Sequence, residues 1–287
     1  MKKIILFLLI PFILKAQFIA NTGAPSETIL HIECRDYNGD QGCLSISAGW
    51  TYYLWWSDFV FVRDSLVHCE NDGYNDSAQS VVINNNQYQV NCACNDLNAI
   101  NMFVRNCLTG AKTDSLIILS DQTGNYRLTL LGICKWQGTA YCLISGYERE
   151  AHPPGVPADD NYGIYRWTPG ETTAYYLYDT GASGGYGMNG LAMNGKYVYT
   201  VSENTDTLEV IDTSNWTQSA VKDMNQAGGQ FRGIAIIGSS IIVANATDKT
   251  LDYYNLSDLS YSSSLDIAEM IIEGNILYGL WTRDEFR

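Results

Sequence analysis

Basic residues are scarce in this chain. Its 287 residues include 17 Lys and Arg against 31 Asp and Glu, which gives a formal net charge of −14 at pH 7. A surface with this excess of negative charge repels phosphate backbones and anionic lipid headgroups. The composition therefore disfavours binding to nucleic acid or to a membrane surface.

Long hydrophobic runs are also rare, and the clearest one lies at the N-terminus. There Met1-Lys2-Lys3 precedes the apolar residues 4–14 and the small residue Ala16. This order is typical of a secretory signal peptide, predicted here over residues 1–16. The run is short for a bilayer span, and no second one follows. We therefore expect an extracellular or cell-surface protein with no membrane insertion after cleavage; the alternative is a buried N-terminal helix.

Helical patterning is missing as well. No stretch longer than a turn or two combines helical periodicity with capping residues. Short apolar runs instead alternate with Gly, Asn, Asp and Ser, and the chain contains 20 Tyr and 7 Trp. Aromatic residues and alternating short runs favour half-exposed β-sheet. The sequence predicts an all-β protein.

One pattern occurs twice in the second half of the chain. Gly190 and Gly233 open the two copies, and both this pair and the pair Thr207 and Thr250 are separated by 43 residues. A fixed period of about 40–45 residues is the signature of a propeller blade. Partial copies flank the matched pair, so the predicted blades begin near residues 132, 190, 233 and 270.

These repeats resemble the YVTN- and LVIVD-type propeller repeats of exported proteins. We assign residues 123–287 to a partial β-propeller of about three and a half blades. An open array of this kind leaves a sheet edge and an apolar blade face uncovered. We therefore expect the sequence to be a fragment, with further blades following.

The first half has a different pattern. Cys43, Trp55 and Cys92 are spaced in a way that resembles the Cys…Trp…Cys frame of immunoglobulin-like domains, and the motifs around Tyr52 and Tyr88 resemble the Ig-like or PKD-like module of secreted Bacteroidota surface proteins. The resemblance implies a β-sandwich over residues 17–122, a disulfide between Cys43 and Cys92, and a spacer or adhesive role.

The eight cysteines fit an exported, disulfide-bonded chain. A three-residue turn at residues 137–139 would place Cys134 and Cys142 on one face of a hairpin, so we expect them to pair. The pairing of four others stays open: Cys34, Cys69, Cys94 and Cys107.

A ligand site is expected where the repeat is interrupted. In a four-stranded blade, the connections between the second and third strands open on the same face as those between blades, and ligand sites favour loops on a rigid scaffold. The insertion at residues 146–161 is rich in charged groups. The candidate ligand-binding residues of this face are Glu148, Arg149, His152, Asp159, Asp160, Tyr186, Asn189, Glu203 and Arg232. Glu148 or Asp160 would serve as acid or base in an enzyme; the alternative is a solvated loop stiffened by proline.

Other motif matches predict less. Residues 181–185 fit G-x-S-x-G and residues 185–190 fit G-x-G-x-x-G, but each motif requires a following helix, and another β-type run follows. No catalytic residue is therefore predicted. Asp36, Asn38 and Asp40 alternate as ligands do in calcium loops, so calcium is the one cofactor considered; a plain β-turn is the alternative.

Two classes of function remain. The first is an exported, non-enzymatic surface, adhesion or recognition protein that binds an extracellular protein or glycan with the propeller loops. The second is a propeller hydrolase or lyase that acts on extracellular polysaccharide.

Overall fold

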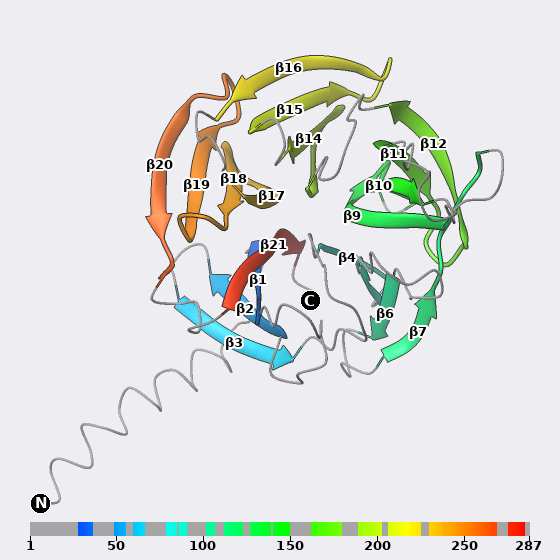
Figure 1. Cartoon of the computed structure of the whole chain (residues 1–287), viewed down its shortest axis with the longest axis horizontal. Coiled ribbons are helices and arrows are strands. Elements are labelled where there is room, and N and C mark those ends of the chain that lie inside the picture. The colour runs from blue at the N-terminus through cyan, green and yellow to red at the C-terminus, as the bar shows by residue number, and fades with distance from the viewer. Residues whose placement is uncertain are drawn as a thin grey trace, which may run out of the picture.

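The computed structural model describes residues 28–36, 49–55, 60–66, 79–84, 86–90, 102–106, 112–122, 127–138, 140–149, 162–179, 189–202, 206–224, 230–268 and 275–284. These residues form strands and short turns, so the predicted all-β class is confirmed. The strands are grouped into five sheets, which stand around a common centre as the blades of a propeller (Figure 1).

Neighbouring strands within each blade are antiparallel, except that β8 pairs with β12 in parallel. Blade 1 combines both ends of the chain: β21 (Asn275–Asp284), β1 (Thr28–Asp36), β2 (Gly49–Trp55) and β3 (Val60–Leu66). Blade 2 contains β4 (Ser80–Ile83), β5 (Asn86–Val90), β6 (Met102–Asn106) and β7 (Lys112–Leu116). Blade 3 contains β8 (Leu119–Ser120), β9 (Arg127–Trp136), β10 (Tyr141–Arg149), β11 (Tyr162–Trp167) and β12 (Thr173–Asp179).

The last two blades are the matched copies of the repeat. Blade 4 contains β13 (Leu191–Asn194), β14 (Tyr197–Ser202), β15 (Thr207–Asp212) and β16 (Thr217–Asp223). Blade 5 contains β17 (Phe231–Ile237), β18 (Ser240–Asn245), β19 (Thr250–Asn255) and β20 (Tyr261–Asp266). The innermost strands β21, β4, β9, β13 and β17 contact one another in sequence around the centre.

The ring closes by pairing strands from opposite ends of the sequence. β21 is antiparallel to β1, with Ile32 opposite Leu280 and Thr28 opposite Asp284. β21 also lies against β4 on one side and β17 on the other. The repeat count predicted an open sheet edge. That edge is covered by β21, which the sequence interpretation assigned to the start of a fourth blade.

The first half of the chain differs from the predicted Ig-like sandwich. A sandwich requires two sheets packed face to face over one core. The described strands of residues 28–116 instead form two separate blades, and the first of them needs β21 from the far end of the chain. The count of three and a half blades is likewise replaced by five. The prediction failed because short alternating strands with polar turns are common to sandwiches and propellers.

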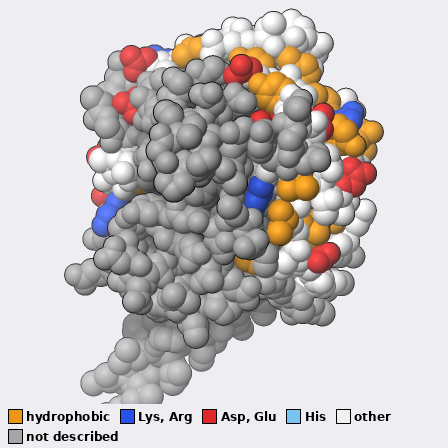
Figure 2. Space-filling view, turned by 45° about the vertical axis from the view of Figure 1, so that its right-hand side comes forward, with side chains coloured by type: hydrophobic (Ala, Val, Ile, Leu, Met, Phe, Trp, Pro, Cys, Tyr) orange, Lys and Arg blue, Asp and Glu red, His pale blue; other side chains and the backbone are white. Residues whose placement is uncertain are grey.

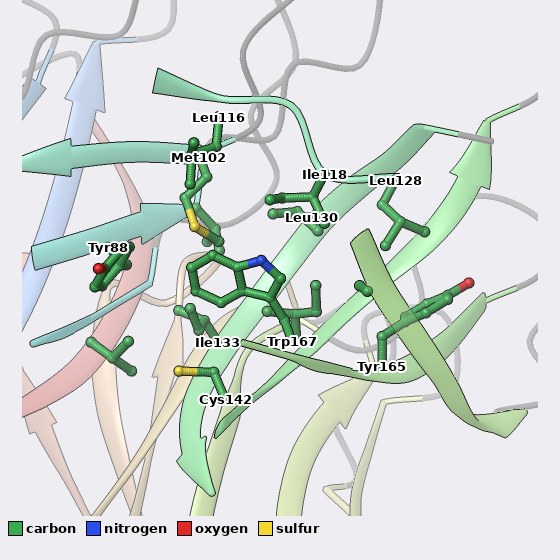
Figure 3. Close-up of a cluster of buried hydrophobic side chains, with 14 of the residues drawn as sticks. Tyr88, Met102, Leu116, Ile118, Leu128, Leu130, Ile133, Cys142, Tyr165 and Trp167 are labelled. Carbon is green, nitrogen blue, oxygen red and sulfur yellow. The ribbon is translucent and has the colours of Figure 1, made fainter. Parts of the chain in front are cut away.

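The core lies between neighbouring blades. One cluster joins blades 2 and 3, where Trp167 is fully buried and its ring meets the edge of Tyr88 at 5.3 Å between centroids (Figure 3). Two further clusters lie between blades 3 and 4 and between blades 4 and 5. Blades 3 and 4 thus bury both faces of their sheets, as stacked repeats must.

Gln79 joins three blades at the centre of the ring. Its Oε1 accepts hydrogen bonds from the backbone N–H of Ile133 (3.0 Å) and Leu191 (2.7 Å), and its Nε2 donates to the carbonyls of Leu191 (3.3 Å) and Ile234 (3.1 Å). These backbone groups belong to the innermost strands of blades 3, 4 and 5. The side chain is fully buried, so this amide satisfies polar groups that water does not reach.

The repeated glycines make room for this amide. A Cβ on Gly132 would lie 2.7 Å from the Cα of Gly190, and one on Gly190 would lie 3.0 Å from Nε2 of Gln79 and 3.1 Å from the Cα of Gly233. Gly190 also has a φ of 89°, which disfavours side chains. Gly132 and Gly190, which open two of the repeats, are therefore required by the close approach of the inner strands.

Candidate functional site

The connections at the two ends of the blades differ in length. At one end, which includes the β9–β10 and β13–β14 hairpins, every connection has between two and five residues. At the other end, five connections have between eleven and thirteen residues, namely 37–48, 67–79, 91–101, 150–161 and 180–190. We call these the short-turn end and the long-loop end. Blades 4 and 5 keep short connections of four residues at both 203–206 and 246–249.

Glu148 belongs to strand β10, which carries the chain to the long-loop end. The sequence interpretation placed this residue in a surface loop, but only 4% of it is exposed. Its Oε1 accepts a hydrogen bond from the hydroxyl of Ser120, which is fully buried on β8. The Ser120 oxygen in turn accepts from the backbone N–H of Gln122 at 3.1 Å. Glu148 therefore anchors the short strand β8, and the loop-face prediction for this residue is wrong.

Two tyrosines surround this carboxylate. Burial, and next the charge of Glu148, raise the pKa of Tyr165. Burial, then Asp179 and Glu148, raise the pKa of Tyr176 to about 12. Both phenols are therefore neutral at ordinary pH. The backbone N–H of Tyr176 donates to Asp121 at 2.9 Å, so the residues around β8 are held by a continuous polar network.

Asn189 is also structural. It is fully buried, and its Nδ2 donates to the carbonyl of Phe231 at 3.0 Å, which links blade 4 to blade 5. Of Arg149 and Arg232 the structure describes the backbone alone. The remaining candidates lie outside the described residues: His152, Asp159, Asp160, Tyr186 and Glu203.

Cys134 and Cys142 are not bonded to each other, contrary to the prediction. Both are buried free thiols. The turn has four residues, 137–140, so Cys134 lies opposite Leu143 and Cys142 lies opposite Lys135. A one-residue change of register reverses the face of a side chain. Cys142 therefore packs between blades 2 and 3 and Cys134 between blades 3 and 4. Burial raises the pKa of the Cys142 thiol to about 12 and that of Cys134 well above its usual value.

The other disulfide and metal predictions cannot be placed on the described chain. Cys43 and Cys92 lie outside it, as do Asn38 and Asp40, while Asp36 ends β1. Within the described residues, no three His, Cys, Asp or Glu side chains gather in a way that would hold a metal ion. The same part of the chain contains no helix long and apolar enough to cross a membrane.

Sequence reasoning missed a cluster at the short-turn end of blades 3 and 4. The guanidinium carbon of Arg166 lies 5.1 Å from the ring centre of Tyr141 and 4.9 Å from that of Tyr175. Trp136 continues the cluster from Tyr141 (6.2 Å) to Trp216 of the next blade (5.8 Å). Figure 2 brings the right-hand side of Figure 1 forward and shows hydrophobic side chains in separate clusters with charged groups among them. The one signal for it in the sequence is the charged Arg166 between the aromatic residues Tyr165 and Trp167.

Comparison with known proteins supports the fold. No family model and no curated protein matches the chain. Among solved structures, a chain from a crystal structure of a nidogen/laminin complex is similar, with a TM-score of 0.55 and 11% identity over 88% of this chain and 98% of that one. Apo AztD from Citrobacter koseri also matches, with a TM-score of 0.40 and 12% identity over 90% of this chain and 98% of that one. The likeness to the first shows the β-propeller fold.

Proposed function

We propose that the chain is an exported, non-enzymatic recognition protein that binds an extracellular protein or glycan at the long-loop end of its propeller. The observation that carries this proposal is the unequal length of the connections. Those of the short-turn end do no more than reverse the chain, whereas five at the other end have eleven residues or more. Rigid scaffolds with long loops on one face commonly bind through those loops.

Export is supported by the sequence. The first 16 residues have the order of a signal peptide, and eight cysteines suit an oxidising compartment. A protein ligand is supported by the similar solved structure, which is that of a nidogen/laminin complex. For the long loops, the net charge of −14 of the chain favours a ligand that is neutral or basic where it contacts them.

Recognition is favoured over catalysis by the state of Glu148. An acid or base must reach the substrate proton. The Glu148 carboxylate is buried and already accepts a hydrogen bond from Ser120, so it is not free to reach a substrate. This weakens the alternative of a polysaccharide hydrolase or lyase, which relied on Glu148 or Asp160.

The test replaces a long connection by a short one from the same chain. Residues 150–161 are exchanged for residues 203–206, which join the same strands in blade 4. Binding of the purified chain to panels of extracellular glycans and surface proteins is measured by biosensor. We expect a bound ligand whose affinity falls about tenfold or more in the loop exchange, since a few loop residues usually supply most of the binding energy.

A Gly-Ser insertion in the exposed turn at Gly238 and Ser239 serves as the control at the short-turn end. Its affinity is expected to stay within about twofold of the parent, because surface changes away from the interface have little effect. Polysaccharide turnover would contradict the proposal, and so would equal ligand binding by the parent and the loop exchange.

A further inference from the structure

We propose that the chain has a second binding surface, at the short-turn end between blades 3 and 4, that takes an acidic segment of a partner protein. We call this surface the aromatic ridge and define it by five residues: Tyr175, Arg166, Tyr141, Trp136 and Trp216. A carboxylate of the partner binds the Arg166 guanidinium, and an adjacent apolar side chain packs against the rings. This surface is separate from the long-loop end.

The ridge begins with an arginine held between two tyrosines. Arg166 and Tyr175 are opposite each other on β11 and β12, and Tyr141 is on the same face at the start of β10. The guanidinium carbon lies 4.9 Å from the ring centre of Tyr175 and 5.1 Å from that of Tyr141, which is within the range of a cation–π interaction. Such stacking covers the planar faces of a guanidinium and leaves its N–H edge for hydrogen bonding.

That edge has no acceptor within the described chain. The Nε of Arg166 is shielded from solvent and has no hydrogen-bond partner. A buried donor without an acceptor lowers stability, because it has lost its hydrogen bonds to water. A carboxylate is the acceptor that best fits the fork of N–H groups on an arginine. Nε itself is shielded, so the carboxylate of the partner would bind the terminal amines, and the guanidinium without an acceptor identifies the chemistry of the ligand.

The equivalent positions in the sister blades show that a cation is not needed there. The strand register identifies the equivalent positions. Arg166 comes directly before the residue that lies opposite Cys142 in blade 3. In the same way, Val210 comes directly before the residue opposite Val198 in blade 4, and Tyr253 directly before the residue opposite Ile241 in blade 5. Val210 and Tyr253 are 5% and 8% exposed. Blades 4 and 5 thus fill this position with buried, mainly apolar side chains, and blade 3 alone among the three carries a guanidinium.

The ridge continues across the boundary between blades. Trp136 is opposite Tyr141 at the end of the β9–β10 hairpin, and its ring meets Trp216 of blade 4 at 5.8 Å. Trp216 has a φ of 53°, in a turn where blade 5 has Leu259 with a φ of 58°. A Leu therefore suffices for the turn itself. Half-buried Trp, Tyr and Arg are the residue types that dominate the binding energy of protein interfaces.

Ring orientation favours a protein segment over a glycan. The Trp136 ring is tilted by 50° to Tyr141 and meets Trp216 edge to face at 69°. Sugar rings stack on open, flat aromatic faces, whereas these rings are inclined to one another. The partner segment is expected to place one carboxylate beside one large apolar residue.

The experiment uses the full chain and three probes. The first is a fluorescent seven-residue peptide with a Trp between two Glu, the second is the same peptide with both Glu changed to Gln, and the third is polyglucuronate. We expect the acidic peptide to bind at least about tenfold more tightly than the neutral one, because a charge-assisted bidentate pair is lost. Binding should also shift the Nε–Hε NMR signal of Arg166.

The variants separate binding from folding. Arg166→Gln should weaken the acidic peptide about tenfold, and Arg166→Lys should weaken it too, because a lysine keeps the charge but not the planar fork. Trp216→Leu, which copies Leu259, should weaken it about threefold. Tyr261→Ser removes a 55% exposed aromatic of blade 5 and should change nothing.

Three outcomes would overturn the proposal: equal affinity for the acidic and neutral peptides, unchanged affinity in both Arg166 variants, or tighter binding of polyglucuronate than of the acidic peptide. A failure here leaves the long-loop end untouched, because the loop exchange and the Arg166 variants alter opposite ends of the blades.

Discussion

Blades 4 and 5 repeat each other down to single hydrogen bonds, whereas blade 3 follows the same plan and departs from it at its edges. The backbone N–H of Trp216 donates to Asp212 in blade 4, and Leu259 donates to Asn255 in the same turn of blade 5. Met224 and Ile267 make the corresponding contacts with Asp206 and Lys249 at the long-loop end. The repeat therefore fixes turns and caps as well as strands.

Blade 3 differs by additions that change what it exposes. β8 pairs with both β9 and β12 and closes the sheet into a small barrel. β10 is nine residues long, against six for β14 and β18, and leads to the connection at 150–161. At the short-turn end, blade 3 carries Arg166 on β11, where blades 4 and 5 have a buried, mainly apolar residue. Regular blades supply the scaffold, and the irregular one supplies groups that a scaffold does not need.

The largest effect is expected where the blades are alike, at the shared amide of Gln79. Gln79→Ala removes partners from backbone groups of three inner strands, each of which is buried. Leaving buried polar groups unsatisfied costs about 1–3 kcal/mol apiece, so we expect a loss of roughly 3–6 kcal/mol in unfolding free energy. Urea denaturation measures it.

Gln122→Ala is the matched control, because that side chain is exposed. It should change the free energy by less than about 0.5 kcal/mol. A loss under about 1 kcal/mol for Gln79→Ala would mean that the three inner strands do not depend on this amide.

Blade 3 is expected to depend on Glu148 for a reason that has no counterpart in blades 4 and 5. Glu148→Ala leaves the Ser120 hydroxyl without its acceptor and should lower the unfolding free energy by about 2–3 kcal/mol. Exposed Glu171→Ala should change it by less than about 0.5 kcal/mol. Unchanged stability with lost ligand binding would restore Glu148 to the loop face.

Giving blade 4 the residue that blade 5 has in the equivalent turn tests how much Trp216 contributes to stability. Trp216→Leu should lower the unfolding free energy by about 1 kcal/mol, because the ring contacts with Trp136 and Tyr178 are lost. Thermal unfolding measures this change, and Val221→Ala, at a 49% exposed site on β16, provides the baseline. No difference between the two variants would show that Trp216 contributes nothing to the boundary between blades 3 and 4.

The smallest effect is expected from Asp212→Asn, which gives blade 4 the residue that blade 5 has at position 255. Hydrogen bonds from Lys196, at 2.5 Å, and from Ser214 lower the pKa of Asp212 to about 2. A lowered pKa adds stability above the unfolded-state value near 4, and this is lost as the pH falls towards 2. The urea midpoint of the variant should therefore lie below the parent at pH 7 and meet it near pH 2. A constant difference across this range would contradict the assignment.

The sequence predicted what depends on local pattern. The all-β class and the propeller are confirmed, and the glycines at 190 and 233 lie at the close approach of neighbouring inner strands. Closure was not predictable in this way, because the pairing of β1 with β21 joins residues some 250 positions apart and leaves no periodic signal. The predicted disulfide between Cys134 and Cys142 is wrong because the turn between their strands is one residue longer than expected. A turn of four residues instead of three places Cys142 on the opposite face of the sheet from Cys134.

The site was harder to predict than the fold for the same physical reason. Its charge led to the prediction that Glu148 lies at the surface. In the structure, Glu148 is buried beside Ser120, and this burial depends on β8, which follows blade 2 and pairs with β9. Arg166 looked like one polar position in a strand. Its meaning follows from Tyr141 and Tyr175, which the register brings to either side of it.

Hydrogen exchange of residues 28–36 tests the central claim, that the two ends of the chain close one five-bladed ring. Exchange is compared between the full chain and a chain ending at Gly274, which lacks β21. We predict slow exchange of β1 in the full chain and fast exchange after truncation, with residues 207–223 of blade 4 affected less, because β1 alone of these loses its paired strand. Equal protection of residues 28–36 in both chains would contradict the closed ring.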